Sequence, residues 1–204
     1  MPGRNTRKVF VENHFYHLYN RGWNRSELFL DDADYRYFEK LMERYVSVAP
    51  VADEKGRLYP HLRPELDLVA YCLMPNHFHM LVCIRTESAA TKFISSVMTA
   101  YTMYFNKKYK RRGPLCENRF KAVIILQDDQ LMHITRYIHL NKADYKTWPW
   151  SSYRDYLNEN PRNWLEPGLI LELFPSKPPY AEFVDDCAGV QREHDSIKKE
   201  LANA

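Results

Sequence analysis

Apolar residues recur along this chain with two periods, and the change between them marks out the expected elements. Residues 13–20, NHFYHLYN, are rich in aromatic side chains and lead into Arg21-Gly22, which predicts a strand that ends in a turn. Residues 31–46 begin with three carboxylates that can cap a helix and then repeat apolar side chains at helical spacing. They predict an amphipathic helix with Tyr35, Phe38, Met42 and Tyr45 on its apolar face.

The middle of the chain predicts a hairpin and two more helices. The apolar run at 66–74 stops at Met74-Pro75-Asn76 and a second run at 77–84 follows directly, so the two are expected to pair as neighbouring strands. Residues 121–127 predict a short buried strand, and residues 129–142 predict a helix. Residues 86–109 predict a long helix whose apolar stripe is Ile94, Val97, Met98, Tyr101, Tyr104 and Phe105.

The order strand, helix, strand, strand, helix, strand is that of a ferredoxin-like α+β fold with a four-stranded antiparallel sheet. Right-handed crossovers place the first two helices on one face of this sheet, and the helix at 129–142 is then available to cover the other face. We expect one domain at residues 1–157 and a partly helical C-terminal extension at 158–204, with a Pro-rich piece, PSKPP, and a charged helical end.

Composition narrows the class of protein. With 204 residues, 45% hydrophobic and 27% charged, the chain suits one soluble globular domain and neither a disordered nor a fibrous protein. The four cysteines form no close pair, and no apolar run approaches the roughly 20 residues of a membrane span. The N-terminus lacks a signal peptide core, so we expect a cytoplasmic protein without a membrane partner.

Two histidines one residue apart stand in the second strand of the hairpin, within YCLMPNHFHMLV at 71–82. Because strand residues two apart share a face, His77 and His79 are expected side by side, with Phe78 and Met80 on the opposite face. Neutral imidazoles are common ligands of transition metals, but two ligands do not complete a site. The same pattern also occurs as hydrogen-bonded histidines without a metal.

The helix at 129–142 can supply what the histidines lack. In ITRYIHLN, Tyr137 and Asn141 are four residues apart and are expected on one helical face, and His133 extends that line as a possible accessory residue. The amide oxygen of Asn141 can complete a site for Mg²⁺ or Mn²⁺ if a substrate adds oxygens. Tyr137 then stands where a nucleophile is needed, although it can equally be a core tyrosine.

Five segments in this order resemble the single-tyrosine transposases of the HUH class, which are IS200-like, and among them the REP-associated tyrosine transposases. The segments are YHLYNRGWNR at 16–25, YCLMPNHFHML at 71–81, NRFKAV at 118–123, RYIHLN at 136–141 and WPWSSY at 148–153. The resemblance implies that His77, His79 and Asn141 hold a metal and that Tyr137 is catalytic. One departure is Asn141-Lys142-Ala143, where the family usually has proline after the asparagine, so the helix is expected to run on or to end differently.

The resemblance also implies the reaction and its substrate. Tyr137 would cut single-stranded or hairpin DNA through a 5′-phosphotyrosine link, beside the stem of a palindromic repeat. Five of the six residues 107–112 are basic, which suits either phosphate binding or a solvated helix end. Trp23 can stack on a base or pack under a loop. The expected DNA-binding residues are Arg21, Trp23, Asn24, Arg25, Lys107, Lys108, Lys110, Arg111, Arg112, Arg119 and Lys121.

Two other functions fit the same sequence. A regulator could use the fold and the basic surface to bind hairpin DNA without cutting it, and a metallohydrolase could use the histidines while Tyr137 is only structural. Relatives build the site within one chain or across a homodimer by exchanging the tyrosine helix, and the sequence is compatible with a monomer or a homodimer.

Overall fold

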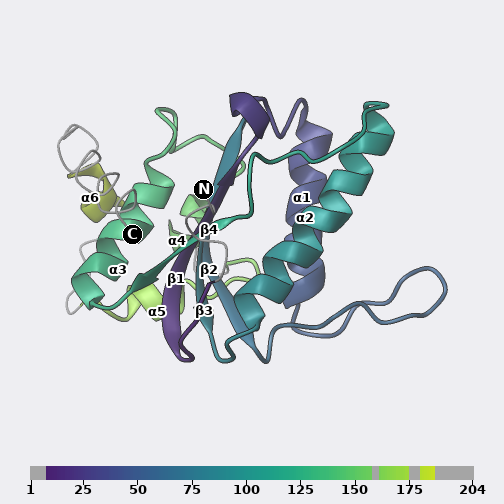
Figure 1. The fold of residues 1–204 in the computed structure, drawn as a ribbon. Coiled ribbons are helices and arrows are strands. Elements are labelled where there is room, and N and C mark those ends of the chain that lie inside the picture. The colour runs from purple at the N-terminus through teal and green to yellow at the C-terminus, as the bar shows by residue number, and fades with distance from the viewer. Residues whose placement is uncertain (1–7, 158–160, 175–179, 187–204) are drawn as a thin grey trace.

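The computed structural model describes residues 8–157, 161–174 and 180–186 (Figure 1). A single sheet runs through the middle of these residues, with helices on both sides. The elements in chain order are β1 (His14–Arg21), the 3-10 helix η1 (Trp23–Arg25), α1 (Asp32–Val46), β2 (Leu66–Met74), β3 (His77–Ile84), α2 (Ala89–Lys108), β4 (Lys121–Ile125), α3 (Asp128–His139), α4 (Tyr153–Leu157), α5 (Gly168–Leu171) and α6 (Tyr180–Asp185).

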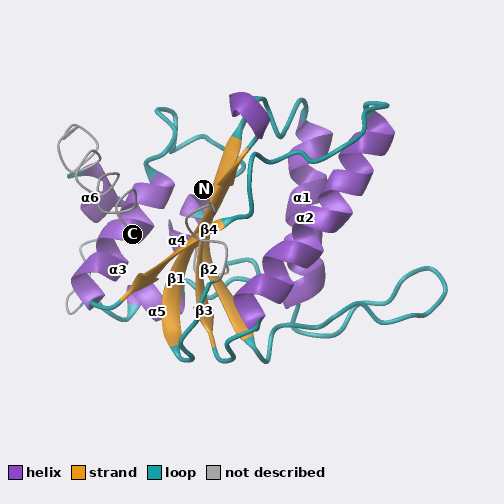
Figure 2. Ribbon diagram, viewed as in Figure 1, coloured by secondary structure: helices purple, strands orange, loops and turns teal. Residues whose placement is uncertain are grey.

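The sheet confirms the ferredoxin-like prediction. Its strand order is β2-β3-β1-β4, and every neighbouring pair is antiparallel. Helices α1 and α2 lie together on one side, and α3 lies on the other (Figure 2). None of the helices in the described ranges is both long and apolar enough to cross a membrane.

The pleat of β2 shows how the two faces are built. Every residue of this strand is buried because the sheet is covered on both sides. Leu68, Tyr71 and Leu73 join the core under α1 and α2, whereas Cys72 and its same-face neighbours join the core under α3. A bulge between Leu68 and Ala70 changes the register with β3 at this point. The same alternation places Phe78 and Met80 of β3 in the first core.

The ends of three elements differ from the predicted ones. Helix α2 begins at Ala89 rather than at residue 86, and β4 ends at Ile125 rather than at 127 because Gln127 is the N-cap of α3. Helix α3 ends at His139 rather than at 142. The side-chain nitrogen of Asn141 donates to the Tyr137 carbonyl at 3.1 Å, which is the acceptor that the backbone N–H of residue 141 would use in a continuing helix.

The end of α2 is fastened to the start of α1 by a cluster of charges. The Asp31 side chain caps α1 by accepting from the Asp34 backbone N–H at 3.1 Å. Lys108 Nζ lies 2.7 Å from a carboxylate oxygen of each aspartate, and the Asp34 side chain is fully buried. Lys108 therefore holds two helices together, and its expected contact with phosphate stays a prediction.

The described parts of the C-terminal extension pack on both cores. Trp164 and Leu165 join the core under α1 and α2, whereas Ile170 and Tyr180 join the core under α3. Tyr180 also bonds through its hydroxyl to Nδ1 of His139, at 2.8 Å. The PSKPP piece at 175–179 and the charged end beyond 186 lie outside the described residues.

We expect His139 to make the protein sensitive to acid. Its ring is buried between Tyr180 and the Ser152 hydroxyl, and burial lowers the pKa of His139 to about 3. In the unfolded chain this pKa is about 6.5, so below that pH the unfolded state binds the extra proton and stability falls by about 1.4 kcal/mol per pH unit. The His139→Gln variant should therefore lose less free energy of unfolding than the wild type between about pH 6 and about pH 4 in urea titrations. Equal losses in the two proteins would contradict this assignment.

Candidate active site

The register between β1 and β3 fixes the position of the two predicted metal histidines. His79 lies opposite Tyr19, and His77 lies opposite Arg21 at the end of the pair. The two imidazoles share the face that α3 covers, with their ring centres 5.2 Å apart. The strand alternation inferred from the sequence is confirmed, and both rings stand where β1, β3 and α3 meet.

Helix α3 brings Tyr137 to the histidines within one chain. Its ring meets His79 edge to face at 5.4 Å between centres, and only 5% of Tyr137 is exposed. Burial raises the pKa of the Tyr137 phenol, and a hydrogen bond from the Asn141 side chain opposes that rise. The phenol is thus protonated at neutral pH, and Asn141 is the neighbour that favours its ionised form.

Asn141 stays beside Tyr137 although it lies outside the helix. Its amide nitrogen donates a hydrogen bond to the Tyr137 carbonyl. Its amide oxygen is the atom that can accept a hydrogen bond or coordinate a metal ion. The expected pairing of Tyr137 and Asn141 is therefore kept by a side-chain bond that ends the helix, and not by a shared helical face. We call His77, His79, Tyr137 and Asn141 the histidine–tyrosine cluster.

Each histidine of this cluster is held at its Nδ1 atom by a second polar side chain. His77 Nδ1 lies 2.6 Å from the Asn76 amide oxygen, which can only accept, so the proton of His77 is on Nδ1 and the lone pair is on Nε2. His79 Nδ1 lies 2.8 Å from Nε2 of His17 on β1. His17 is not among the site residues predicted from the sequence. It stands two residues before Tyr19, so the period of two along the strand places both side chains on the same face.

The candidate donors of the cluster are two imidazoles and one amide oxygen, and they include no thiolate. Among the described residues, no group of three or more histidine, cysteine, aspartate or glutamate side chains is arranged so that it could hold a metal ion by itself. Cys72 lies opposite His79 in the sheet, but burial raises the pKa of its thiol to about 12, so it is a neutral thiol. Two imidazoles and one amide oxygen leave positions that oxygens of a substrate or of water would have to fill.

A depression of about 640 Å³ opens directly beside His77. It brings together four of the residues expected to bind DNA, from β1, η1, β4 and the loop before β4. Arg21 is paired with Glu117 at 3.0 Å. We call this feature the basic depression, and its lining includes Arg21, Arg25, Asn76, His77, Glu117, Arg119 and Lys121.

Trp23 and Asn24 form η1 at the rim of the same end of the sheet. Trp23 is 58% exposed, so the alternative that it packs under a loop is wrong. Asn24 has a left-handed backbone, with φ of 48°. An exposed indole on a short turn can stack on an unpaired base.

The remaining predicted residues lie elsewhere. None of the basic residues at 107–112 lines the basic depression. Arg111 donates to the Pro114 carbonyl at 3.3 Å, and Lys107, Lys110 and Arg112 lie near the exposed end of α2. His133 Nδ1 bonds to Arg136, whose guanidinium lies 4.5 Å from the Phe183 ring centre. That contact belongs to the packing of α6 on α3.

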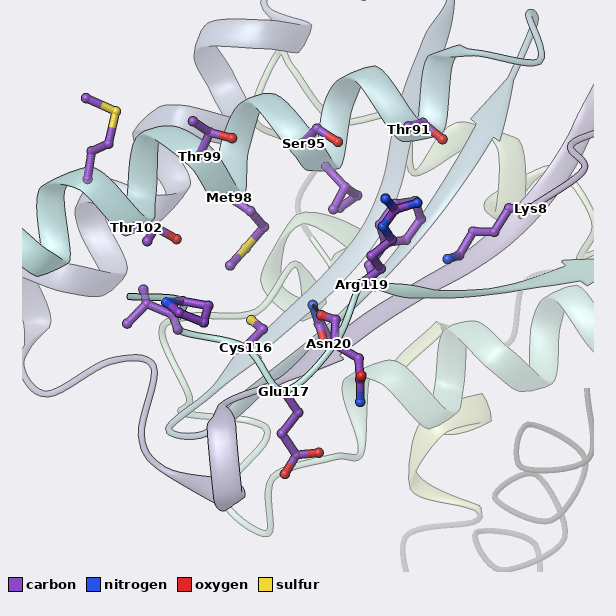
Figure 3. A pocket seen from close by; sticks show the side chains of 16 residues that line it. Lys8, Asn20, Thr91, Ser95, Met98, Thr99, Thr102, Cys116, Glu117 and Arg119 are labelled. Atoms are coloured by element: carbon purple, nitrogen blue, oxygen red, sulfur yellow. Dashed lines mark hydrogen bonds between the residues drawn. The ribbon is translucent and has the colours of Figure 1, made fainter. Parts of the chain in front are cut away.

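A second groove, of about 980 Å³, continues from the basic depression along α2 (Figure 3). The two share Arg119 and its neighbours Glu117 and Asn118. Side-chain hydroxyl groups of α2 line one wall of this groove. Lys8 also lines the groove, and its side chain points toward Arg119 (Figure 3). Burial and the nearby charge of Arg119 lower the pKa of Lys8, which marks two close positive charges. We call this second groove the helix groove, and the hydroxyl groups that line it belong to Thr91, Ser95, Thr99 and Thr102.

Comparisons with known proteins bear on the family and on the fold. The sequence model of the family described as "Transposase IS200 like" matches residues 61–141. The solved structure of a REP-associated tyrosine transposase bound to a REP hairpin is similar, with a TM-score of 0.59 and 12% identity over 87% of this chain and 96% of that chain. The TM-score shows a shared fold, and at this identity the likeness shows the fold alone.

A second solved structure, of a chain assigned as a transposase from Deinococcus radiodurans R1, has a TM-score of 0.39 and 16% identity over 68% of this chain and 95% of that chain. That score is too low to compare the folds. No curated protein sequence matches this chain.

Proposed function

Because residues 61–141 match the sequence model of the IS200-like transposases, we propose that this chain cuts and rejoins single-stranded DNA with Tyr137 as its nucleophile. The observation that carries the proposal is the contact between Tyr137 and His79, because it joins a nucleophile to two candidate metal ligands in one chain. The basic depression beside His77 gives that cluster a place for a phosphate backbone.

The proposed reaction is a transesterification. The phenol oxygen of Tyr137 attacks the phosphorus of a phosphodiester, so that an O–P bond to tyrosine forms and the P–O3′ bond breaks. The phenol loses its proton, and the departing 3′ oxygen takes one up. The number of ester bonds at phosphorus is unchanged, so a 3′ hydroxyl can later attack the phosphotyrosine and rejoin a strand without a nucleotide cofactor.

His77, His79 and Asn141 are the residues that would hold Mg²⁺ or Mn²⁺. A bound ion of this kind polarises the phosphate and stabilises the charge that develops on it. Hydrogen bonds orient all three side chains in the absence of an ion. Asn76 and His17 bond to Nδ1 of the two imidazoles, and the Tyr137 carbonyl accepts from the amide nitrogen of Asn141. Asn141 also opposes the effect of burial on the Tyr137 phenol.

The two grooves suggest how DNA lies on the protein. A phosphate in the basic depression would stand between His77 and the side chains of Arg119 and Lys121. The strand could continue along the hydroxyls of the helix groove, which can donate hydrogen bonds to phosphates without a fixed charge (Figure 3). The relative of similar fold is bound to a REP hairpin, and we extend that class of substrate, a folded palindromic repeat, to this chain.

The test is incubation of the wild-type protein with labelled hairpin DNA that carries single-stranded flanks, in Mg²⁺ or Mn²⁺, followed by denaturing electrophoresis. The proposal expects a labelled band at the mass of the protein plus the attached DNA, and a DNA fragment with a free 3′ hydroxyl. Free 5′ phosphate ends without an adduct would show a hydrolase instead. Binding without cleavage, measured by fluorescence anisotropy, would show a regulator.

Variants at two basic residues should distinguish a role in DNA binding from a role in folding. Arg119→Ala removes a charge from both grooves, so DNA affinity should fall and its dependence on salt should become weaker by about one unit of slope. Lys108→Ala should instead lower the free energy of unfolding by about 2 kcal/mol or more, because the buried Asp34 carboxylate loses its cation. Anisotropy over a salt series and urea unfolding measure the two effects, and a larger loss of DNA affinity from Lys108→Ala would contradict the assignment.

A further inference from the structure

His17 lies in the sheet directly next to the histidine–tyrosine cluster and is fully buried. Its ring stacks with Tyr19 at 5.0 Å on the same strand and with His79 at 4.9 Å on the neighbouring strand. Its Nε2 atom lies 2.8 Å from Nδ1 of His79. The contact is a diagonal one across the strand pair, because Tyr19 is the residue directly opposite His79.

The other nitrogen of His17 argues against a purely structural role. Its Nδ1 atom is buried and has no hydrogen-bond partner among the residues that the structure describes. A buried polar atom without a partner destabilises a fold, and an apolar side chain at this position would avoid that cost. The other ring nitrogen, Nε2, forms its hydrogen bond with the imidazole that the proposed function assigns to the metal.

We propose that His17 is a positioning residue that accepts a hydrogen bond from Nδ1–H of His79 and so fixes both the ring and the tautomer of that ligand. An imidazole that keeps its proton on Nδ1 presents the lone pair of Nε2 at the far end of the ring, where a metal can be bound. Asn76 imposes the same tautomer on His77, because its amide oxygen faces Nδ1 of that ring.

Together the two hydrogen bonds fix the orientation and the tautomer of both imidazoles in the metal-free protein. The Asn76 bond is local, because the residue precedes His77 in the chain, whereas the His17 bond links β1 to β3. The role in metal binding rests on the proposed function, while the tautomer of His79 is a property of the protein alone. These two parts can be measured separately.

The experiment compares His17→Leu with His17→Gln, since a glutamine amide can replace the Nε2 contact and leucine cannot. Mn²⁺ affinity is measured by electron paramagnetic resonance, and the protonation of the His79 nitrogens is measured by ¹⁵N NMR in the metal-free protein. We expect His17→Leu to weaken Mn²⁺ binding by about tenfold to about a hundredfold and to mix the His79 tautomers. We expect His17→Gln to recover most of the affinity and the wild-type tautomer.

The matched control is His139→Gln, which makes a similar change at another fully buried histidine, whose ring nitrogens bond to Tyr180 and Ser152 and not to a residue of the cluster. It should leave Mn²⁺ affinity and the His79 tautomer unchanged, and its urea midpoint shows what the loss of a buried imidazole does to folding. Wild-type Mn²⁺ affinity in His17→Leu, or a proton on Nε2 of His79 in the wild type, would overturn the inference. If the wild type binds no Mn²⁺, the proposed function fails, and the NMR result still decides whether His17 sets the tautomer.

Discussion

Replacing Tyr137 by phenylalanine is expected to abolish the covalent adduct with DNA and to lower strand cleavage by at least about a thousandfold. The substitution removes only the phenol oxygen that would attack phosphorus. The ring can keep its edge-to-face contact with His79 and its place in the core under α3. Denaturing electrophoresis of labelled DNA measures the adduct, and Mn²⁺ binding and DNA anisotropy should stay close to the wild-type values.

The matched control for that experiment is Tyr145→Phe. Tyr145 is also buried in the core under α3, but its hydroxyl bonds to Asp185 at the end of α6. Its loss should affect stability and leave the adduct intact. An adduct that survives in Tyr137→Phe would assign the nucleophile to another residue, and cleavage to 5′ phosphate ends in that variant would favour hydrolysis.

The burial of Tyr137 bears on how such a nucleophile works. With 5% of the residue exposed and its pKa raised, the phenol is a weaker acid than a tyrosine in water. Attack therefore needs help in removing the proton or in stabilising the phosphate. In the proposed reaction the hydrogen bond from Asn141 favours loss of the proton because it opposes the rise in the pKa of Tyr137, and a metal held by His77 and His79 would stabilise the phosphate.

The parts of the site that follow from local periodicity could be predicted from the sequence. The period of two in β3 places His77 and His79 on one face and Phe78 on the other, whatever the neighbouring strands are. The spacing of four between Tyr137 and Asn141 likewise keeps them in contact, although the helix ends before Asn141. The helix ends before Asn141 because the side-chain amide of Asn141 takes the place of its backbone N–H at the Tyr137 carbonyl. The spacing of residues in the sequence does not reveal which of these two donors is bonded.

The parts that depend on pairing between distant segments could not be predicted. His17 and His79 are 62 positions apart, and their contact exists only because β1 pairs with β3 in one particular register. The role of Lys108 in joining two helices could not be predicted for the same reason, because Lys108 is bonded to carboxylates 74 and 77 positions away in the chain. A charged residue near a helix end can bind a ligand or join two helices, and only the tertiary structure distinguishes these roles.

Replacing either cluster histidine is expected to remove metal-dependent cleavage and to spare most of the affinity for DNA. His77→Ala and His79→Ala each delete one of two imidazoles, and metal assistance is worth several kcal/mol, so cleavage should fall by at least about a hundredfold. DNA affinity should remain within about threefold of the wild type, because in the proposed complex the electrostatic contacts that dominate it would come from basic residues such as Arg119 and Lys121. A chelator added to the wild type should reproduce the loss of cleavage and leave binding intact.

The control for this pair is His61→Ala, because His61 bonds to the Ser47 carbonyl at 2.8 Å near the end of α1 and takes no part in the cluster. His77→Ala is the more decisive of the two variants, since His77 is partly exposed and its loss leaves a smaller cavity than the loss of the buried His79. If both variants unfold at the same lowered urea concentration and lose DNA binding together with cleavage, the histidines serve the fold, and the metal assignment is wrong. If His77→Ala folds and binds DNA normally but cleaves it only when Mn²⁺ is raised, a weakened metal site explains the result, because mass action restores the bound form.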